Sequence, residues 1–197
     1  MKKMKYILLV LMMALAMMSC GKAEKEETEH TEDITADVPE DAAAEEKADA
    51  EPVMLFGHFD AKTLDGEEVT EEIFANADLT MVNIWGTFCG PCIEEMPYLG
   101  EISREYEEKG FQMVGILCDV FEPGDETALE IVNETKADYM HLVASEDLTE
   151  NVLQYVSSVP TTVFIDKDGY LVGEVYAGAR DKTTWELIIN QYLPEVQ

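Results

Sequence analysis

The stretch that decides the fold is residues 85–92, which read Trp-Gly-Thr-Phe-Cys-Gly-Pro-Cys. The residues that lead into it, 79–85, form a short apolar run typical of a parallel strand buried on both faces. After it, apolar residues recur at steps of three and four between residues 93 and 106, which predicts a helix with one buried face. Cys89 is therefore expected at a strand-to-helix turn, at or near the N-cap of the helix.

This position has a chemical use for Cys89. The first turn of a helix presents unpaired N–H groups and the positive end of the helix dipole, and both favour a thiolate over a thiol. Pro91 falls where a missing N–H costs the helix nothing, and Gly90 lets the turn close, so Cys92 comes within disulfide reach. The simplest interpretation is a dithiol that opens and closes, with Cys89 as the attacking sulfur.

Two other interpretations of the cysteine pair remain open, namely half of a zinc site and a static cross-link. A structural zinc site usually has four N, S or carboxylate ligands. The chain has no second pair of cysteines, and its histidines, His30, His58 and His141, are not paired at ligand spacing. The sequence therefore favours the redox interpretation and predicts no metal and no other cofactor.

Residues 85–92 resemble the active site of the thioredoxin superfamily, and specifically that of the extracytoplasmic TlpA/ResA-like thiol-disulfide oxidoreductases. Two further features carry the resemblance. Asn83 stands where cytoplasmic thioredoxins have a buried Asp and where TlpA/ResA-like proteins commonly have Asn. Residues 95–97, Glu-Met-Pro, resemble the Glu-Phe-Pro segment that follows the second cysteine in ResA-like proteins. The resemblance covers roughly residues 53–193.

The resemblance implies a substrate-binding surface around the dithiol. Pro160 corresponds to the proline that is cis in this family and packs beside the two cysteines. A proline there leaves the backbone of Val159 free to bind an extended substrate segment in β fashion. The remaining substrate-binding candidates are Trp85, Phe88, Gly90 and Pro91.

Glu95 is the candidate third catalytic residue. It follows Cys92 by three residues and so lies on the same face of the helix, where it could relay protons to the resolving thiol. Burial would raise the pKa of Glu95 and make it a proton acceptor near neutral pH. The alternative is an exposed Glu95, one more charge in an acidic helix.

Residues 53–197 are expected to form one α/β domain with a thioredoxin-like fold, a central mixed sheet flanked by helices and an N-terminal hairpin extension. An Asp-Gly pair at residues 168–169 predicts an antiparallel hairpin late in the chain. The expected strands are 56–59, 68–69, 79–85, 111–120, 139–144, 163–165 and 170–176, and the expected helices are 71–75, 93–106, 127–136, 148–156 and 185–193.

The chain begins with features of an exported lipoprotein. Residues 1–20 have a basic start and thirteen apolar residues at 6–18, as in a signal peptide. They end in Met17-Met18-Ser19-Cys20, which resembles a bacterial lipobox and predicts lipidation of Cys20. Met17 stands where a lipobox usually has Leu, so an export signal without lipidation remains an alternative. Residues 21–52, with thirteen acidic residues against three lysines, predict a disordered tether. We therefore expect a lipid-anchored protein on the extracytoplasmic face of a bacterial cell membrane.

The chain is strongly acidic, with a formal net charge of −29 at pH 7. Residues 53–197 alone carry 29 Asp and Glu against 7 Lys and Arg, a net charge of −22. This charge excludes nucleic acid as a partner, because nothing neutralises its phosphates, whereas a basic partner surface would be attracted.

The remaining cysteine, Cys118, ends an apolar strand and is expected to be a small buried apolar side chain, with a third redox thiol as the alternative.

The resulting hypothesis is a membrane-tethered thiol-disulfide oxidoreductase that reduces disulfides of exported proteins. Gly-Pro between the cysteines resembles reducing thioredoxins, which favours reduction over oxidation. The family resemblance implies that a membrane thiol donor of the CcdA or DsbD type resupplies the electrons. Two alternatives remain: a disulfide-donating or isomerising enzyme, and a lipoprotein that holds a partner, such as an apocytochrome or a methionine sulfoxide reductase, with little turnover of its own.

Overall fold

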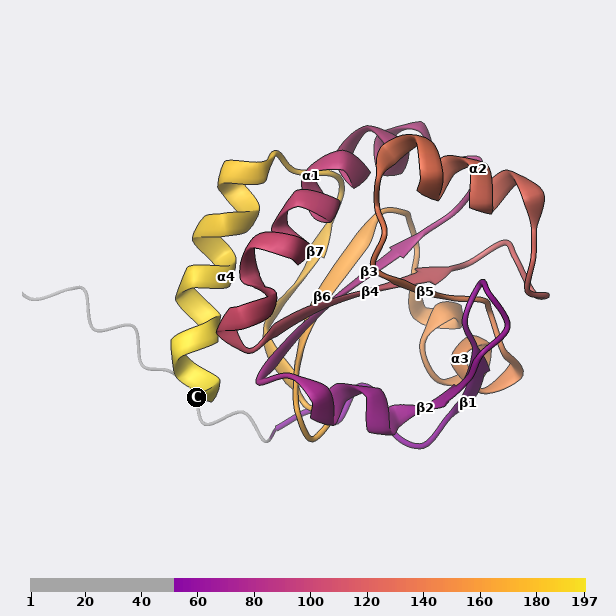
Figure 1. Ribbon diagram of the computed structural model, residues 1–197. Coiled ribbons are helices and arrows are strands. Elements are labelled where there is room, and N and C mark those ends of the chain that lie inside the picture. The colour runs from indigo at the N-terminus through magenta and orange to yellow at the C-terminus, as the bar shows by residue number, and fades with distance from the viewer. Residues whose placement is uncertain (1–51) are drawn as a thin grey trace, which may run out of the picture. The chain divides into compact units, whose positions relative to one another are not determined.

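The computed structural model describes residues 52–197, which build a mixed five-stranded sheet between two layers of helices and loops (Figure 1). The strands stand in the order β5-β4-β3-β6-β7. The central strand β3 pairs parallel with β4 and antiparallel with β6, which confirms the predicted mixed sheet. The strands are β3 Leu79–Trp85, β4 Phe111–Leu117, β5 Met140–Leu142, β6 Thr161–Asp166 and β7 Leu171–Ala177.

Strand β3 is buried along its whole length and contributes to the core on both faces of the sheet. Met81 packs in the core under α1 and α4, whereas its neighbour Val82 packs in the core on the opposite face, as the alternation of a strand requires. Figure 1 shows α1, α2 and α4 on one side of the sheet, with α4 at the left, and α3 with the N-terminal hairpin on the other side. The helices are α1 Gly90–Tyr106, α2 Glu126–Thr135, α3 Glu146–Asn151 and α4 Lys182–Val196.

The N-terminal hairpin forms, but its first strand lies later than predicted. Strand β1 is Asp60–Lys62 and pairs with β2, Glu68–Thr70, after which comes the short 3-10 helix η1, Glu71–Asn76. The prediction of a strand over residues 56–59 is wrong. Phe56 and Phe59 are both buried and both contact Phe74, which requires them to point to the same side, and side chains three apart in a strand would point to opposite sides.

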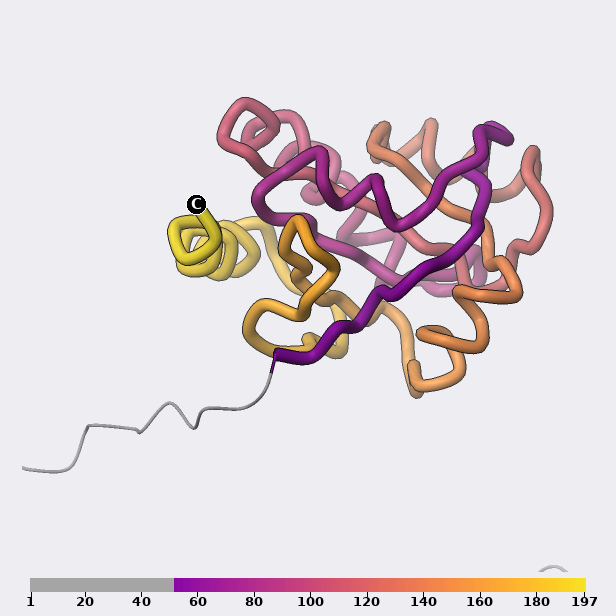
Figure 2. Tube along the Cα trace, turned by 90° about the horizontal axis from the view of Figure 1, so that it is seen from below, coloured from indigo at the N-terminus to yellow at the C-terminus, as the bar shows by residue number. Residues whose placement is uncertain are grey.

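The start of the described chain lies beside the β6–β7 turn rather than extending from the domain (Figure 2). The backbone N–H groups of Leu55 and Phe56 donate to the carbonyl of Gly169, at 3.1 and 3.3 Å. Gly169 has a φ of 88°, which the Asp-Gly turn uses to close the hairpin. Thus the predicted turn at 166–169 both joins two strands and anchors the chain start.

Two predicted elements are shorter in the structure. The strand predicted over 111–120 ends at Leu117, and the residues after it turn toward the active-site loop. The helix predicted over 148–156 is α3, which Ser145 caps by accepting a hydrogen bond from the N–H of Leu148, followed by a separate 3-10 turn, η3, Leu153–Tyr155. The remaining predicted helices and strands agree with the structure to within a few residues.

The predicted signal peptide, the predicted lipidation site Cys20 and all but the last residue of the predicted tether lie outside the described residues. Between residues 52 and 197, none of the helices combines the length and the hydropathy that crossing a membrane needs.

Candidate active site

Cys89 and Cys92 form a disulfide at the N-terminus of α1, which confirms that the pair can close. Cys89 is the N-cap, and its sulfur accepts a hydrogen bond from the backbone N–H of Cys92 at 3.2 Å. Pro91 lies in the first turn of the helix, where no N–H is needed. Cys92 is fully buried and Cys89 is 5% exposed, so an incoming sulfur reaches Cys89 first.

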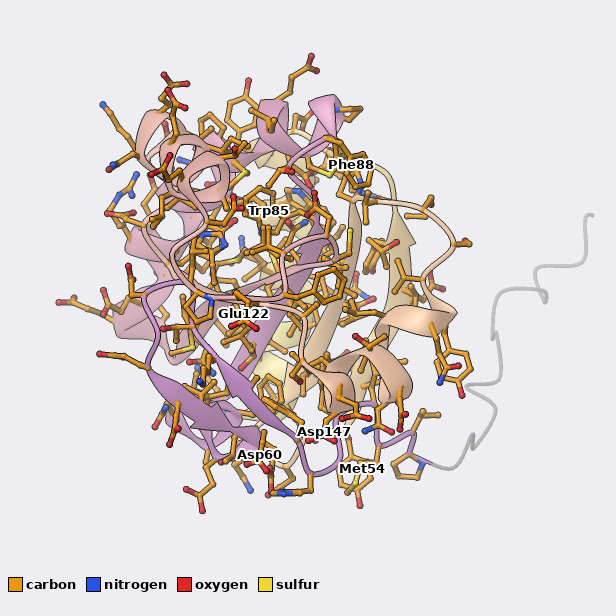
Figure 3. The ribbon with its side chains drawn as sticks, turned by 90° about the vertical axis from the view of Figure 1, so that its right-hand side faces the viewer. Met54, Asp60, Trp85, Phe88, Glu122 and Asp147 are labelled. Atoms are coloured by element: carbon orange, nitrogen blue, oxygen red, sulfur yellow. A yellow bond between two sulfur atoms is a disulfide. The ribbon has the colours of Figure 1, made fainter. Side chains whose placement is uncertain are left out.

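Several of the predicted substrate-binding residues are exposed next to the two cysteines in the sequence. The Phe88 side chain is 71% exposed and stands at the edge of the molecule in Figure 3. Gly90 and Pro91 are exposed as well. The peptide bond between Val159 and Pro160 is cis, as the family resemblance implies.

Trp85 does not reach this surface. Its side chain is fully buried in the same core cluster as the two cysteines, and its Nε1–H donates to Nδ1 of His141 at 3.2 Å. Nε2 of His141 lies 2.8 Å from the carbonyl of Ala137, and burial lowers the pKa of His141 to about 4, so the ring is neutral and Nδ1 is free to accept. The structure therefore places Trp85 as a support beneath the disulfide, with no exposed face to offer a substrate.

Glu95 is buried, with 2% of its surface exposed, so the exposed alternative is wrong. Its Oε1 accepts from Asn83 Nδ2 at 3.0 Å, and its Oε2 accepts from the backbone N–H of Arg180 at 3.0 Å and from Trp185 Nε1 at 3.4 Å. Burial raises the pKa of Glu95, while these N–H donors and the charge of Arg180 oppose the rise. A carboxyl group held in this way can exchange a proton inside the core.

Asn83 joins Glu95 to strand β6. Its Nδ2 also donates to the hydroxyl of Thr162 at 3.0 Å, two residues after Pro160. Its Oδ1 is buried and has no hydrogen-bond partner in the described part of the chain. Because an amide can rotate by half a turn, Asn83 can offer N–H to the carboxylate form of Glu95 or Oδ1 to the acid form.

Among residues 52–197, no three His, Cys, Asp or Glu side chains come together as a candidate metal site. Residues 44–184 match the redoxin family. This chain belongs to the redoxin family. Among its relatives, thiol-disulfide oxidoreductase ResA of Bacillus thuringiensis subsp. konkukian is 31% identical over 139 residues, which are 70% of this chain and 76% of the relative. ResA of Oceanobacillus iheyensis is 31% identical over 137 residues, 66% of this chain and 67% of the relative. The redoxin is thus a thiol-disulfide oxidoreductase of the ResA type, with Cys89 and Cys92 as its cysteine pair.

Solved structures similar to this redoxin share the thioredoxin-like fold. A thiol:disulfide interchange protein of the thioredoxin family from Chlorobium tepidum TLS matches with a TM-score of 0.61 and 24% identity, over 74% of this chain and 99% of that one. A second Chlorobium tepidum structure, of a putative thiol:disulfide interchange protein DsbE, matches with a TM-score of 0.57 and 22% identity, over 70% of this chain and 94% of that one. At these identities the likeness establishes the fold alone.

Asp119 is a site residue of the redoxin that the sequence did not single out. Its carboxylate accepts from the backbone N–H of Thr87, at 3.0 and 3.1 Å, and from the Thr87 hydroxyl at 2.5 Å, so it fixes the loop that leads to Cys89. Its position in the sequence could have indicated this role. Asp119 follows the strand that neighbours β3, and the carboxyl ends of neighbouring parallel strands meet at one edge of a sheet.

Cys118 of the redoxin packs against the core but is only partly buried, so the expectation of a small buried apolar side chain is confirmed in part. A Cβ atom at Gly86 would lie 3.1 Å from the sulfur of Cys118, which places this thiol against the active-site loop. Burial and the neighbouring Asp119 raise the pKa of Cys118, so its sulfur is protonated at neutral pH and is a poor nucleophile.

Proposed function

We propose that this protein is a membrane-tethered reductase of disulfides in exported proteins. The observation that carries the proposal is a Cys-Gly-Pro-Cys disulfide at a helix N-terminus, one turn before a buried carboxyl group. The Gly-Pro dipeptide resembles that of reducing thioredoxins and supports reduction.

The reaction transfers two electrons from the dithiol to the substrate. The Cys89 thiolate attacks one sulfur of the substrate disulfide, forming a mixed disulfide and releasing the other substrate sulfur as a thiolate. Cys92 then loses its proton and attacks the sulfur of Cys89, which releases the second substrate sulfur and leaves the enzyme oxidised, the state seen here. The two substrate thiolates each take up a proton and leave as thiols.

Glu95 is proposed as the acceptor of the proton from Cys92. It follows Cys92 by three residues on the buried face of α1, and its raised pKa lets it hold a proton closer to neutral pH than an ordinary glutamate does. The Asn83 amide would serve both states of Glu95, donating to the carboxylate and, after rotation, accepting from the acid.

The extended substrate segment is proposed to bind along Val159 and Pro160, with Phe88 and Pro91 as the apolar contacts that exclude water. A lipid anchor on Cys20 would place the enzyme at the membrane, where a thiol donor of the CcdA or DsbD type would reduce the Cys89–Cys92 disulfide after each turnover.

Insulin reduction tests the direction of the reaction. With dithiothreitol as electron source, the wild-type protein should accelerate reduction of the insulin disulfides, and its reduction potential should lie near that of thioredoxin, about −270 mV. A potential near that of DsbA, about −120 mV, would instead make the protein a disulfide donor. Stable capture of a protein without insulin reduction would favour a partner-holding lipoprotein.

The two cysteines should behave differently when substituted. Cys89→Ser should reduce insulin no faster than dithiothreitol alone, because the attacking sulfur is lost. Cys92→Ser should accumulate mixed disulfides, because the sulfur that resolves them is lost. Non-reducing gels of proteins purified from cells measure this directly, and absence of covalent partners on the Cys92 variant would contradict the assigned order.

The proposed anchor predicts how the protein partitions. Acyl chains on Cys20 should carry the mature protein into the detergent phase, and Cys20→Ala should move it to the aqueous phase. A Cys20→Ala variant that stays as firmly membrane-bound as the wild type would remove the lipoprotein proposal.

A further inference from the structure

One short loop contacts both Pro160, the proposed substrate-binding residue, and the buried carboxyl group of Glu95. The loop lies between β7 and α4. The backbone N–H of Gly178 donates to the carbonyl of Pro160 at 2.8 Å, and the backbone N–H of Arg180 donates to Glu95 Oε2 at 3.0 Å. Gly178 has a φ of 86°, a left-handed conformation that lets the loop turn between these two contacts.

The side chain of Arg180 holds this loop in place. Its Nη1 donates to the carbonyls of Ala177, at 3.3 Å, and Gly178, at 2.8 Å. Its guanidinium lies over two rings, 4.9 Å from the centroid of Tyr176 and 5.1 Å from that of Trp185. Because Trp185 Nε1 also lies 3.4 Å from Glu95 Oε2, Arg180 packs on one donor to Glu95 and supplies another from its own backbone.

The charge of Arg180 is unusual in this setting. It is one of only two arginines in a sequence that contains 42 acidic residues. Its charge favours the ionised form of Glu95, in the same direction as its backbone N–H. Arg180 therefore acts on Glu95 in two ways, through the position of the loop and through its charge.

Other groups around Glu95 come from several elements. Asn83 faces it from β3 and links it to Thr162 of β6, Trp185 faces it from α4, and Cys92 precedes it on α1. The remaining titratable neighbour is Tyr139, before β5, whose buried hydroxyl has no hydrogen-bond partner in residues 52–197 and whose pKa is raised first by burial and then by Glu95. Near neutral pH this tyrosine stays uncharged and adds no anion beside Glu95, and Arg180 supplies the positive charge that acts on it.

We propose that Arg180 is a positioning residue for disulfide exchange, which holds the loop that connects the substrate-binding Pro160 to the carboxyl group of Glu95. The proposal rests on the proposed role of Glu95 in proton transfer. Since one loop carries both hydrogen bonds, a displacement of its Gly178 end by a substrate segment changes the donor that Glu95 receives from Arg180. Substrate docking and the proton affinity of Glu95 are thereby linked.

The test is the titration of Glu95 in the reduced full-length protein, followed by the ¹³C chemical shift of its side-chain carboxyl group. Arg180→Ala should raise the midpoint of the Glu95 titration by about one pH unit. The carboxylate loses a nearby positive charge, and the backbone N–H of residue 180 is no longer held in place to donate to it. Arg180→Lys should give an intermediate rise, because Lys keeps the charge but lacks the planar fork that holds Ala177 and Gly178.

Arg104→Ala is the matched control, because Arg104 is the other arginine and pairs with Asp138 at the surface. Its midpoint should equal that of the wild type. An unchanged midpoint in Arg180→Ala, an equal rise in Arg104→Ala, or a wild-type midpoint in Arg180→Lys would each overturn the proposal. Arg180→Lys also serves as the second variant if Arg180→Ala fails to fold, as judged by near-ultraviolet circular dichroism.

Insulin reduction by the same variants separates this proposal from the proposed function. The positioning role is supported if Arg180→Ala is less active than the wild type and its pH–activity profile moves with the Glu95 midpoint. This change in the profile should vanish when Arg180→Ala is combined with Glu95→Gln. A wild type that reduces no disulfide overturns the proposed function, whatever the Glu95 titration shows. A wild type that reduces insulin, with an unmoved Glu95 midpoint in Arg180→Ala, overturns only the role of Arg180.

Discussion

Glu95 is 2% exposed, while Glu94 beside it and Glu101 further along the same helix face water. Burying a carboxylate is costly unless hydrogen-bond donors surround it. Glu95 has three, from Asn83, Arg180 and Trp185, yet burial still raises its pKa. The domain therefore retains a destabilising group beside its cysteine pair, which is the pattern expected of a functional residue.

Glu95→Gln tests this interpretation. A carboxylate near two thiols disfavours their ionisation, so replacing it with a neutral amide should move the alkylation curve of the reduced thiols to lower pH by about half a unit to one unit, and should slow insulin reduction. The pH dependence of iodoacetamide alkylation measures the first effect.

Glu94→Gln is the control for Glu95→Gln, since it removes the same charge from an exposed neighbour. Its alkylation curve should match that of the wild type, because water screens an exposed charge. Superimposable curves for Glu95→Gln and the wild type would leave Glu95 without a role in thiol chemistry.

At the scale of elements, the active site depends on how closely β4 and β5 approach beneath Trp85. Gly115 of β4 pairs with His141 of β5, and a Cβ atom at Gly115 would lie 2.3 Å from Nδ1 of His141 and 3.1 Å from Nε1 of Trp85. A side chain on Gly115 would therefore occupy the space of the hydrogen bond that holds Trp85 under the disulfide.

Gly115→Ala should destabilise the domain by about 1–3 kcal/mol, because the added methyl group forces His141 or Trp85 out of place. Urea unfolding followed by tryptophan fluorescence measures the loss. Gly57→Ala is the matched control: apart from its chain neighbours, no residue has an atom within 4 Å of the added Cβ, so its stability should stay within about 0.5 kcal/mol of the wild type. Equal stability of both variants would show that the β4–β5 contact tolerates a side chain.

Features set by neighbouring residues could be predicted from the sequence. The strand before Cys89, the helix after it and the Asp-Gly hairpin all follow from patterns within about ten residues, and they form as predicted. The partners of the buried polar groups could not, since Arg180 is 85 residues from Glu95 and His141 is 56 residues from Trp85. Such pairs depend on how strands and helices pack, which no local pattern encodes.

At the scale of the whole molecule, the dominant feature is charge. Residues 53–197 carry a net charge of −22, and their few cations are partly engaged with carboxylates, as Lys182 is with Glu101 and Glu105. A field of this size acts beyond direct contact distance in dilute salt and is screened over about 10 Å at 0.1 M ionic strength. It should therefore influence which substrates approach Cys89, before any specific contact forms.

Basic and acidic disulfide peptides should report this field. Two peptides that share one disulfide and differ only in flanking Lys or Glu residues can be reacted with reduced Cys92→Ser protein, with the rate of mixed-disulfide formation as the readout. At 20 mM salt the Lys peptide should react roughly ten times faster than the Glu peptide, and at 0.5 M salt the two rates should agree within about twofold, because screening removes the attraction and the repulsion. Flanking charge also alters the intrinsic reactivity of a disulfide, so each rate is divided by that of the same peptide with dithiothreitol. A corrected ratio that does not change with salt would show that the acidic surface serves solubility alone and does not select substrates.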